Sequence, residues 1–139
     1  WLVMNLDTRR IVRDPNLLDE DGTCHENVIE TPADKVQMPK DVEPELVMTH
    51  KVSYSDVDMN GHANNAMYMH WAMNAVGYDI TASHKVKSLT INFNHEIKPQ
   101  EDVDLYRACV ETEDGLHVFM EGKLADQSAF IVEILFEKD

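Results

Sequence analysis

The stretch NNAMYMHWAMNAV, residues 64–76, predicts a helix that is apolar nearly all the way round. Such a helix is expected to be buried on most sides rather than to lie on a surface. Its methionines favour core packing, although methionine also suits a lining that adapts to a flexible chain. The rest of the fold must therefore supply a cover for this helix.

Segments with strand-like alternation of apolar and polar residues lie on both sides of the helix in the sequence. Residues 46–54 predict a strand, and Asp114-Gly115 predicts a hairpin turn. After the helix, four further strands are expected in antiparallel succession: residues 89–97, 103–111, 116–124 and 130–136. One long buried helix wrapped by a curved antiparallel sheet explains both patterns, so the predicted fold class is α+β.

Composition and charge exclude several classes of function. The chain has 139 residues, 43% of them hydrophobic, which is enough for one compact domain, and its apolar runs are too short for a transmembrane helix. Twelve Lys and Arg against 26 Asp and Glu give a formal net charge of −14, which disfavours nucleic acids and anionic membranes. Cys24 and Cys109 lack the spacing of a zinc or redox motif, so we expect reduced thiols and a cytoplasmic location.

The chain divides into three segments by composition. Residues 1–13 begin with a strand-like apolar run, and residues 14–44 contain four of the five prolines and many acids. That composition is typical of an extended connection rather than of a core. Residues 45–139 contain the predicted helix and strands and are expected to form the compact domain.

A polar motif, YSDVDMNGHANN, lies at the start of the apolar helix. If the motif is extended, Asp58, Asn60 and His62 share one side of the chain and could form an acid/base site. The same residues are also explained as turn formers, with Asn64 as the helix N-cap. The residue pattern alone leaves both interpretations open.

The remaining candidates carry weaker signals. Gly61 fits a tight turn with positive φ or a close approach of substrate. Four further histidines lack metal-ligand spacing and are expected at the surface or the edge of the core: His70, His84, His95 and His117. We therefore expect these histidines not to hold a metal.

The polar motif, followed by Tyr68 and Trp71, resembles the signature of the acyl-acyl-carrier-protein (acyl-ACP) thioesterases of the hot-dog superfamily. WLVMNLDTRR at residues 1–10 resembles the segment that closes the first hot-dog domain of that family. LTINFNHE at residues 89–96 resembles the strand that carries its second cluster of site residues. The resemblance covers essentially the whole chain and implies a hot-dog fold.

The resemblance also implies a domain organisation. Family members carry two hot-dog domains, so residues 45–139 are expected to be the second domain, residues 14–44 a linker, and residues 1–13 the terminal strand of the first. Hot-dog sheets commonly pair edge to edge. We therefore expect this domain to pair either with a copy of itself or with a first domain.

Four residues match the catalytic residues of the family: Asp58, Asn60, His62 and Glu96. We expect four neighbours in the motif to bind substrate: Gly61, Ala63, Asn64 and Asn65. Plant members commonly have a cysteine after the glutamate, where this chain has Ile97. That departure argues against a thiol nucleophile and leaves a carboxylate-based scheme.

Thioester hydrolysis requires a polarised carbonyl, an activated water and a released thiolate. Backbone N–H groups around His62 and Ala63 are expected to polarise the carbonyl oxygen. Either Asp58 or Glu96 is the general base, or Asp58 attacks the carbonyl to give an anhydride, and the sequence does not separate these routes. Asn60 would orient substrate or water, and His62 would fix a carboxylate or protonate the leaving thiol.

The implied reaction, a step of fatty acid biosynthesis, converts a fatty acyl chain on an acyl carrier protein to a free fatty acid and the carrier thiol. Carrier proteins are acidic, so the net charge of this chain opposes them at long range. A local basic patch would have to come from a few residues: Arg9, Arg10, Arg13, Lys85 and Lys87. Two alternatives remain, an acyl-CoA thioesterase and a non-catalytic hot-dog module that binds acyl chains or dimerises.

Overall fold

The structure is a computed structural model in two units, residues 1–32 and 33–139. It describes residues 4–5, 7–8, 10–12 and 29–137. In the first unit, Met4 and Ile11 form an isolated antiparallel bridge. That this segment belongs to a preceding hot-dog domain stays a prediction. The predicted connection up to residue 28 lies outside the described residues, as does Cys24.

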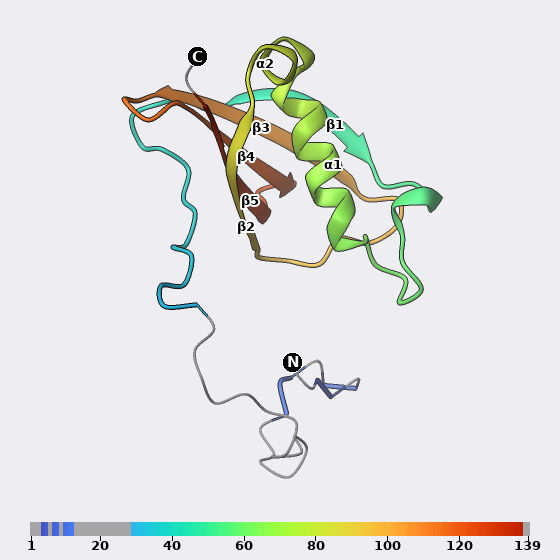
Figure 1. The fold of residues 1–139 in the computed structure, drawn as a ribbon. Coiled ribbons are helices and arrows are strands. Elements are labelled where there is room, and N and C mark those ends of the chain that lie inside the picture. The colour runs from blue at the N-terminus through green and yellow to red at the C-terminus, as the bar shows by residue number, and fades with distance from the viewer. Residues whose placement is uncertain (1–3, 6, 9, 13–28, 138–139) are drawn as a thin grey trace. The chain divides into compact units, whose positions relative to one another are not determined.

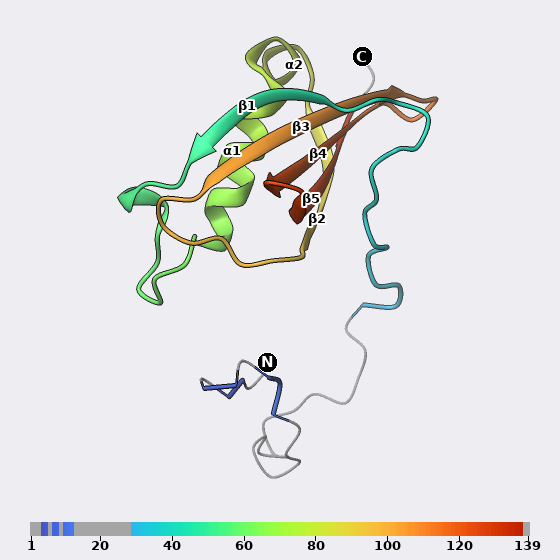
Figure 2. The ribbon, with the colours of Figure 1, turned by 180° about the vertical axis from the view of Figure 1, so that it is seen from behind.

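The second unit contains an antiparallel sheet with one long helix across it. Its strands are β1 (Glu45–Lys51), β2 (Val86–Phe93), β3 (Asp102–Glu111), β4 (Leu116–Leu124) and β5 (Gln127–Phe136). The helix α1 (Asn65–Val76) lies against one face of this sheet, and the short helix α2 (Tyr78–Ser83) follows it (Figure 1). From behind, β1 and β3 pass in front of α1 (Figure 2). The predicted α+β class, a helix held by a curved antiparallel sheet, is confirmed.

The order of the strands differs from the predicted succession. The sheet runs β1-β3-β4-β5-β2, so β2 pairs with β5 and not with β3. Leu89 of β2, for example, lies opposite Ile134 of β5. The predicted order is wrong because β3 already has β1 on one side and β4 on the other. As a result β1 and β2 form the two edges of the sheet.

Two predicted strands are shorter than expected, and one helix is missing from the prediction. The first strand ends at Lys51 and is followed by a single 3-10 turn, η3 (Tyr54–Asp56). The strand predicted to reach Ile97 ends at Phe93. The sequence of α2, YDITAS, includes β-branched and hydroxyl side chains that weaken a helical pattern, which explains why it was not predicted.

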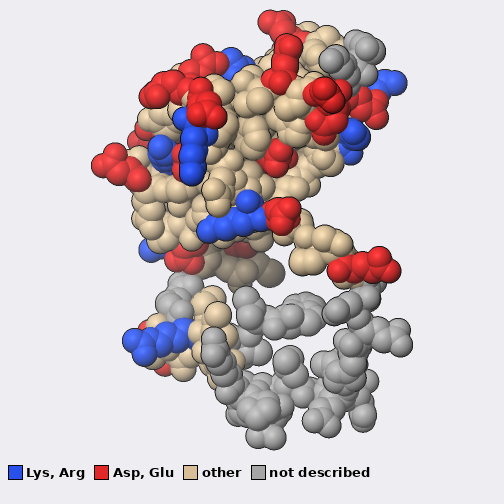
Figure 3. All heavy atoms as spheres, turned by 90° about the vertical axis from the view of Figure 1, so that its left-hand side faces the viewer, with Lys and Arg blue, Asp and Glu red and all other residues tan. Residues whose placement is uncertain are grey.

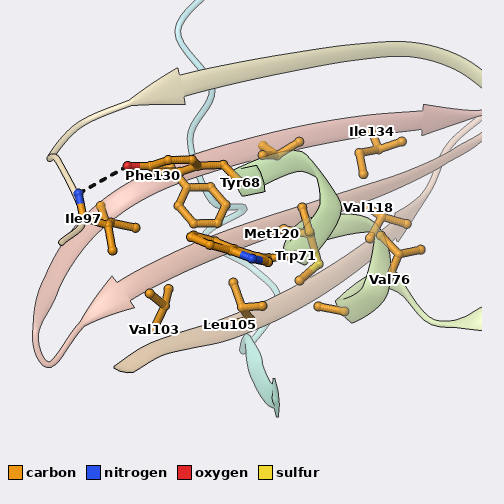
Figure 4. Packing of buried hydrophobic residues seen from close by; sticks show 14 of the residues in the cluster. Tyr68, Trp71, Val76, Ile97, Val103, Leu105, Val118, Met120, Phe130 and Ile134 are labelled. Atoms are coloured by element: carbon orange, nitrogen blue, oxygen red, sulfur yellow. Dashed lines mark hydrogen bonds between the residues drawn. The ribbon is translucent and has the colours of Figure 1, made fainter. Parts of the chain in front are cut away.

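The helix α1 is covered on most of its circumference, as its sequence predicts. Five of its residues are buried: Tyr68, Trp71, Ala72, Ala75 and Val76. Its methionines are half-buried, and Asn65, Ala66, His70 and Asn74 are exposed. Figure 4 shows Tyr68 and Trp71 packed beside Phe130 of β5, with Leu105 of β3 below them. The aromatic end of this core lies directly under the start of α1, where the polar motif meets the helix.

The described end of the predicted connection, residues 33–44, is extended and is held against the domain. Val36 is buried, and its amide donates to the Asn92 side-chain oxygen of β2 at 2.6 Å.

Carboxylates are spread over the face of the molecule seen in Figure 3, with fewer Lys and Arg between them. No helix in the described residues is long and apolar enough to cross a membrane.

Candidate active site

The polar motif folds into a tight turn between η3 and α1. The Asp58 amide donates to the His62 carbonyl at 2.9 Å, and the Gly61 amide donates to the Asp58 carbonyl at 3.1 Å. Val57 and Ala63 form an antiparallel bridge at the base of this turn. Of the two interpretations left open by the sequence, the structure shows the turn, and this turn places Asp58 opposite His62. Gly61 has φ +78°, which confirms the predicted positive-φ turn.

The Asp58 carboxylate is held by the backbone of its own turn. Its Oδ1 accepts the Asn60 amide at 2.8 Å and the His62 amide at 3.4 Å. The Asn60 amide, followed by the other bonds from Asn60 and His62, lowers the pKa of the Asp58 carboxyl below its ordinary value. Asp58 is therefore ionised at neutral pH. Asn60 itself is exposed, and both its backbone amide and its side-chain amide donate to the Asp58 carboxylate.

The start of α1 determines which amides remain for a ligand. The Ala63 amide donates to the Ile97 carbonyl at 2.8 Å, and the Asn64 side chain caps the helix by accepting the Ala66 amide at 3.0 Å. The predicted N-cap role of Asn64 is confirmed. The amides of His62 and Ala63 were predicted to donate to the substrate carbonyl. In the structure both already have acceptors, Asp58 Oδ1 for His62 and the Ile97 carbonyl for Ala63. The first helical amide, that of Asn65, has no carbonyl of a preceding turn to receive it.

Glu96 reaches the motif from the loop that follows β2. The amides of Asn94 and His95 both donate to the Ala129 carbonyl, at 2.8 and 2.9 Å, and turn the chain away from the sheet. Glu96 Oε2 then lies 3.5 Å from His62 Nε2, with side chains 41% and 24% exposed. The sequence predicted Glu96 within the strand of residues 89–97, whereas the structure places it in this loop.

A cavity of about 310 Å³ lies where these segments meet. It is lined by Asp58, His62, Ala63, Asn65, Tyr68, Phe93, Asn94, His95 and Glu96. Five of the eight predicted site residues are in this lining; Asn60, Gly61 and Asn64 are not. Sequence reasoning missed Phe93, Asn94 and His95, although their position immediately before Glu96 was a signal that could have found them.

A second cavity, of about 540 Å³, shares Asp58 with the first. It is lined by Tyr54, Ser55, Val57, Asp58, Met59, Pro99 and Gln100. Tyr54 and Met59 are almost fully exposed there.

No three His, Cys, Asp or Glu side chains in the described part of the chain gather closely enough to hold a metal ion.

Comparison with known proteins identifies the family. Residues 39–138 match the family described as the acyl-ACP thioesterase C-terminal domain. The chain belongs to this family. It is 27% identical over 113 residues to oleoyl-acyl carrier protein thioesterase 2, chloroplastic, of Arabidopsis thaliana, and 23% identical over 118 residues to the corresponding chloroplastic enzyme of Coriandrum sativum. Each match covers 75% of this chain and 31% of the relative, so the chain spans about a third of these acyl-ACP thioesterases.

Solved structures of acyl-ACP thioesterases share the fold. The 12:0-ACP thioesterase from Umbellularia californica superposes with a TM-score of 0.71 at 19% identity, over 98% of this chain and 52% of that one. An acyl-ACP thioesterase from Bacteroides thetaiotaomicron gives a TM-score of 0.63 at 19% identity, over 96% of this chain and 53% of that one. The predicted hot-dog fold is confirmed.

Proposed function

We propose that this chain supplies the catalytic domain for hydrolysis of fatty acyl-ACP thioesters to free fatty acid and carrier thiol. Its membership of the acyl-ACP thioesterase family supports thioester hydrolysis. The observation that carries the assignment of the site is that Asp58, His62 and Glu96, from two separate segments, line one cavity. The reaction needs no metal or organic cofactor.

The Asn65 amide is the proposed donor to the thioester carbonyl oxygen. It is the first amide of α1, at the positive end of the helix dipole, and Asn65 lines the cavity. A fixed donor of this kind stabilises the oxyanion of the tetrahedral intermediate, and losing one typically costs ~10²–10³ in rate. The Asn64 cap holds this first helical turn in place.

Glu96 is the proposed general base. It removes a proton from water as the water oxygen attacks the carbonyl carbon, and the carbonyl electron pair moves onto oxygen. Collapse of the intermediate breaks the carbon–sulfur bond, and the proton passes through His62, 3.5 Å from Glu96, to the leaving sulfur. Asp58 is less suited as base because its lowered pKa reduces its proton affinity, so it orients the attacking water.

Direct attack by Asp58 is the competing route, in which the carboxylate forms an anhydride and expels the thiolate. A single turnover in ¹⁸O-labelled water detects an anhydride that opens at the Asp58 carbonyl, whereas opening at the acyl carbonyl labels the fatty acid, as direct attack of water does. Water activated by Glu96 places the label in the fatty acid at the first turnover. Attack of water on the Asp58 carbonyl of an anhydride would instead leave the label in Asp58, which mass spectrometry of the peptide detects.

The two cavities beside Asp58 fit the two arms of a thioester. A thioester carbonyl has the acyl chain on one side and the thiol carrier on the other. Asp58 lines both cavities, so a carbonyl at this carboxylate has space for an arm in each. Cavities of several hundred cubic ångströms are the size that ligand sites in proteins usually have.

Pairing of this domain through β2 is part of the proposal. The strand β2 is an edge of the sheet, and three of its apolar residues are exposed: Val86, Leu89 and Phe93. Unpaired edge strands with apolar side chains favour pairing with another strand. Because Phe93 also lines the cavity, a second hot-dog domain on this edge would close the site.

The acidic carrier needs positive charge on this chain. Lys85 and Lys87 are exposed at the start of β2 and are the described basic residues of the predicted docking patch in this unit. Arg10 belongs to the first unit, and Arg9 and Arg13 lie outside the described residues. We include Lys85 and Lys87 in the proposed contact with the carrier protein, since local charge of opposite sign can steer association against an unfavourable net charge.

The test of the proposed function is thiol release from matched panels of acyl-ACP and acyl-CoA substrates, with Asp58→Asn as the control. Turnover of the ACP panel that collapses in the variant supports the proposal. Faster turnover of the CoA panel identifies an acyl-CoA thioesterase. Acyl binding without turnover, unchanged by Asp58→Asn, identifies a non-catalytic module.

A further inference from the structure

Asp56 is a buried carboxylate that the proposed reaction does not use. Of the charged residues that the structure describes, it alone is buried, with 3% of its surface exposed. It lines neither of the two cavities. A buried ionised group is retained only where hydrogen bonds compensate for its lost hydration, so its partners indicate what it does.

The partners of Asp56 come from three different elements. Its Oδ2 accepts the Ser53 amide at 2.7 Å, the Ser53 hydroxyl at 2.8 Å and His50 Nε2 at 3.0 Å. Its Oδ1 accepts the Trp71 indole N–H at 3.4 Å. The His50 ring also packs on Trp71, with ring centroids 4.7 Å apart. One carboxylate therefore joins the end of β1, the turn η3 and the middle of α1.

The same residue fixes both ends of the loop that carries the site. The loop begins immediately after Asp56, and the Asp56 carbonyl accepts the amide of Asn64, the helix cap at its other end, at 2.8 Å. Asp58 and His62 lie between these two points. Moving the Asp56 side chain would move the loop relative to α1, and with it the distance from His62 to Glu96.

The electrostatics agree with a permanently ionised anchor. Burial raises the pKa of the Asp56 carboxyl, but the bonds from Ser53 and His50 outweigh burial and hold the pKa below its ordinary value. The group is not part of a nucleophilic relay. Such a relay needs a serine bonded to the histidine, whereas the Ser53 hydroxyl donates to Asp56.

We propose that Asp56 is a positioning residue, whose bonds to His50, Ser53 and Trp71 set the loop so that Asp58 and His62 face Glu96 and the Asn65 amide. This inference rests on the proposed function. A displacement of about 1 Å of catalytic groups costs up to ~10²-fold in rate. A positioning role therefore predicts a large effect on kcat from a residue that does not contact substrate.

The main test is Asp56→Asn, which preserves shape and removes the charge. We expect kcat to fall ~10–100-fold with KM within about twofold of the wild type. Amide hydrogen exchange should accelerate in residues 57–64 and stay unchanged in β3, β4 and β5. The control is Asp104→Asn, which removes a carboxylate that accepts the Thr49 hydroxyl away from the loop, and should leave kcat and loop exchange unchanged.

If Asp56→Asn does not fold, a second variant, His50→Phe, tests whether Asp56 positions the loop. It keeps a ring against Trp71 and removes one donor to Asp56. A smaller loss of kcat with faster exchange of residues 57–64 supports the proposal. The proposal is overturned if a folded Asp56→Asn variant has wild-type kcat and wild-type exchange of the loop amides. If Asp56→Asn does not fold, the same result in His50→Phe overturns the proposal. If the wild type hydrolyses no acyl thioester, the proposed function fails, and hydrogen exchange alone still decides whether Asp56 holds the loop.

Discussion

His62 Nε2 lies 3.5 Å from Glu96 Oε2, although His62 precedes α1 and Glu96 follows β2. The backbone sets this distance. The residue after His62 donates its amide to the carbonyl of the residue after Glu96, an Ala63–Ile97 hydrogen bond of 2.8 Å. The Ile97 amide in turn donates to the Tyr68 hydroxyl at 3.3 Å (Figure 4). A buried aromatic residue of α1 therefore anchors the loop that carries Glu96.

Glu96→Gln tests the proposed general base. The amide keeps the size of the side chain and cannot accept a proton from water, so kcat for acyl-ACP hydrolysis should fall ~10²–10⁴-fold. Steady-state thiol release measures the change. Glu113→Gln, an exposed glutamate in the turn between β3 and β4, is the matched control and should keep wild-type kcat. A Glu96→Gln enzyme with wild-type kcat would assign the base elsewhere.

Asp58→Asn tests the second carboxylate. Removing its charge should lower kcat at least ~10²-fold, because the variant can neither orient the attacking water as a carboxylate nor form an anhydride. The lowered pKa of Asp58 gives a further expectation in the wild type. Asp58 should stay ionised near neutral pH, so its titration should not change the activity there. Its carboxylate should become protonated, and the activity should fall, only below the ordinary pKa of an aspartate, about 3.9. Retention of most of the rate by Asp58→Asn would refute the role.

Local patterns predicted much of this fold, and long-range pairing accounts for what they missed. The apolar run of α1 and the Asn64 cap depend on neighbours within a few residues, and both are confirmed. The strand β2 pairs with β5 because β1 and β4 already flank β3. A local sequence pattern does not indicate such long-range pairing. Asp58 and His62 are close in the chain, but the contact with Glu96 requires the Ala63–Ile97 bond. The proposed role of Asp56 likewise depends on tertiary contacts, with His50 and Trp71.

Leu89→Lys tests pairing through β2. Leu89 is exposed on this edge and does not itself line the cavity, so a charge there opposes strand pairing without changing a lining side chain. If the chain pairs with its own copy, light scattering should give twice its mass of 15.9 kDa, and the variant should shift toward the monomer. Tyr78→Lys, at an exposed apolar residue of α2, should leave the mass unchanged. A wild type that is monomeric at all concentrations excludes self-pairing.

His117 links the stability of the sheet to pH. Its Nδ1 lies 2.8 Å from Glu133 on β5, and its Nε2 lies 3.2 Å from Asp114 in the β3–β4 turn. Burial lowers the pKa of His117, but the bonds to Glu133 and Asp114 outweigh it and raise the pKa above its ordinary value. The folded state therefore binds this proton more tightly than the unfolded state does. The resulting stabilisation is complete below the unfolded pKa of about 6.5 and is lost as pH rises through the folded pKa.

His117→Gln should accordingly reduce the free energy of unfolding more at pH 5.5 than at pH 8.5. We expect a difference of about 1 kcal/mol, the usual size for a partly exposed hydrogen bond between charged groups. Urea unfolding at the two pH values measures it. His70→Gln, at an exposed histidine of α1, is the control and should show no such difference. An equal loss at both pH values would mean that His117 contributes packing on Phe119, with ring centroids 6.2 Å apart, and not charge.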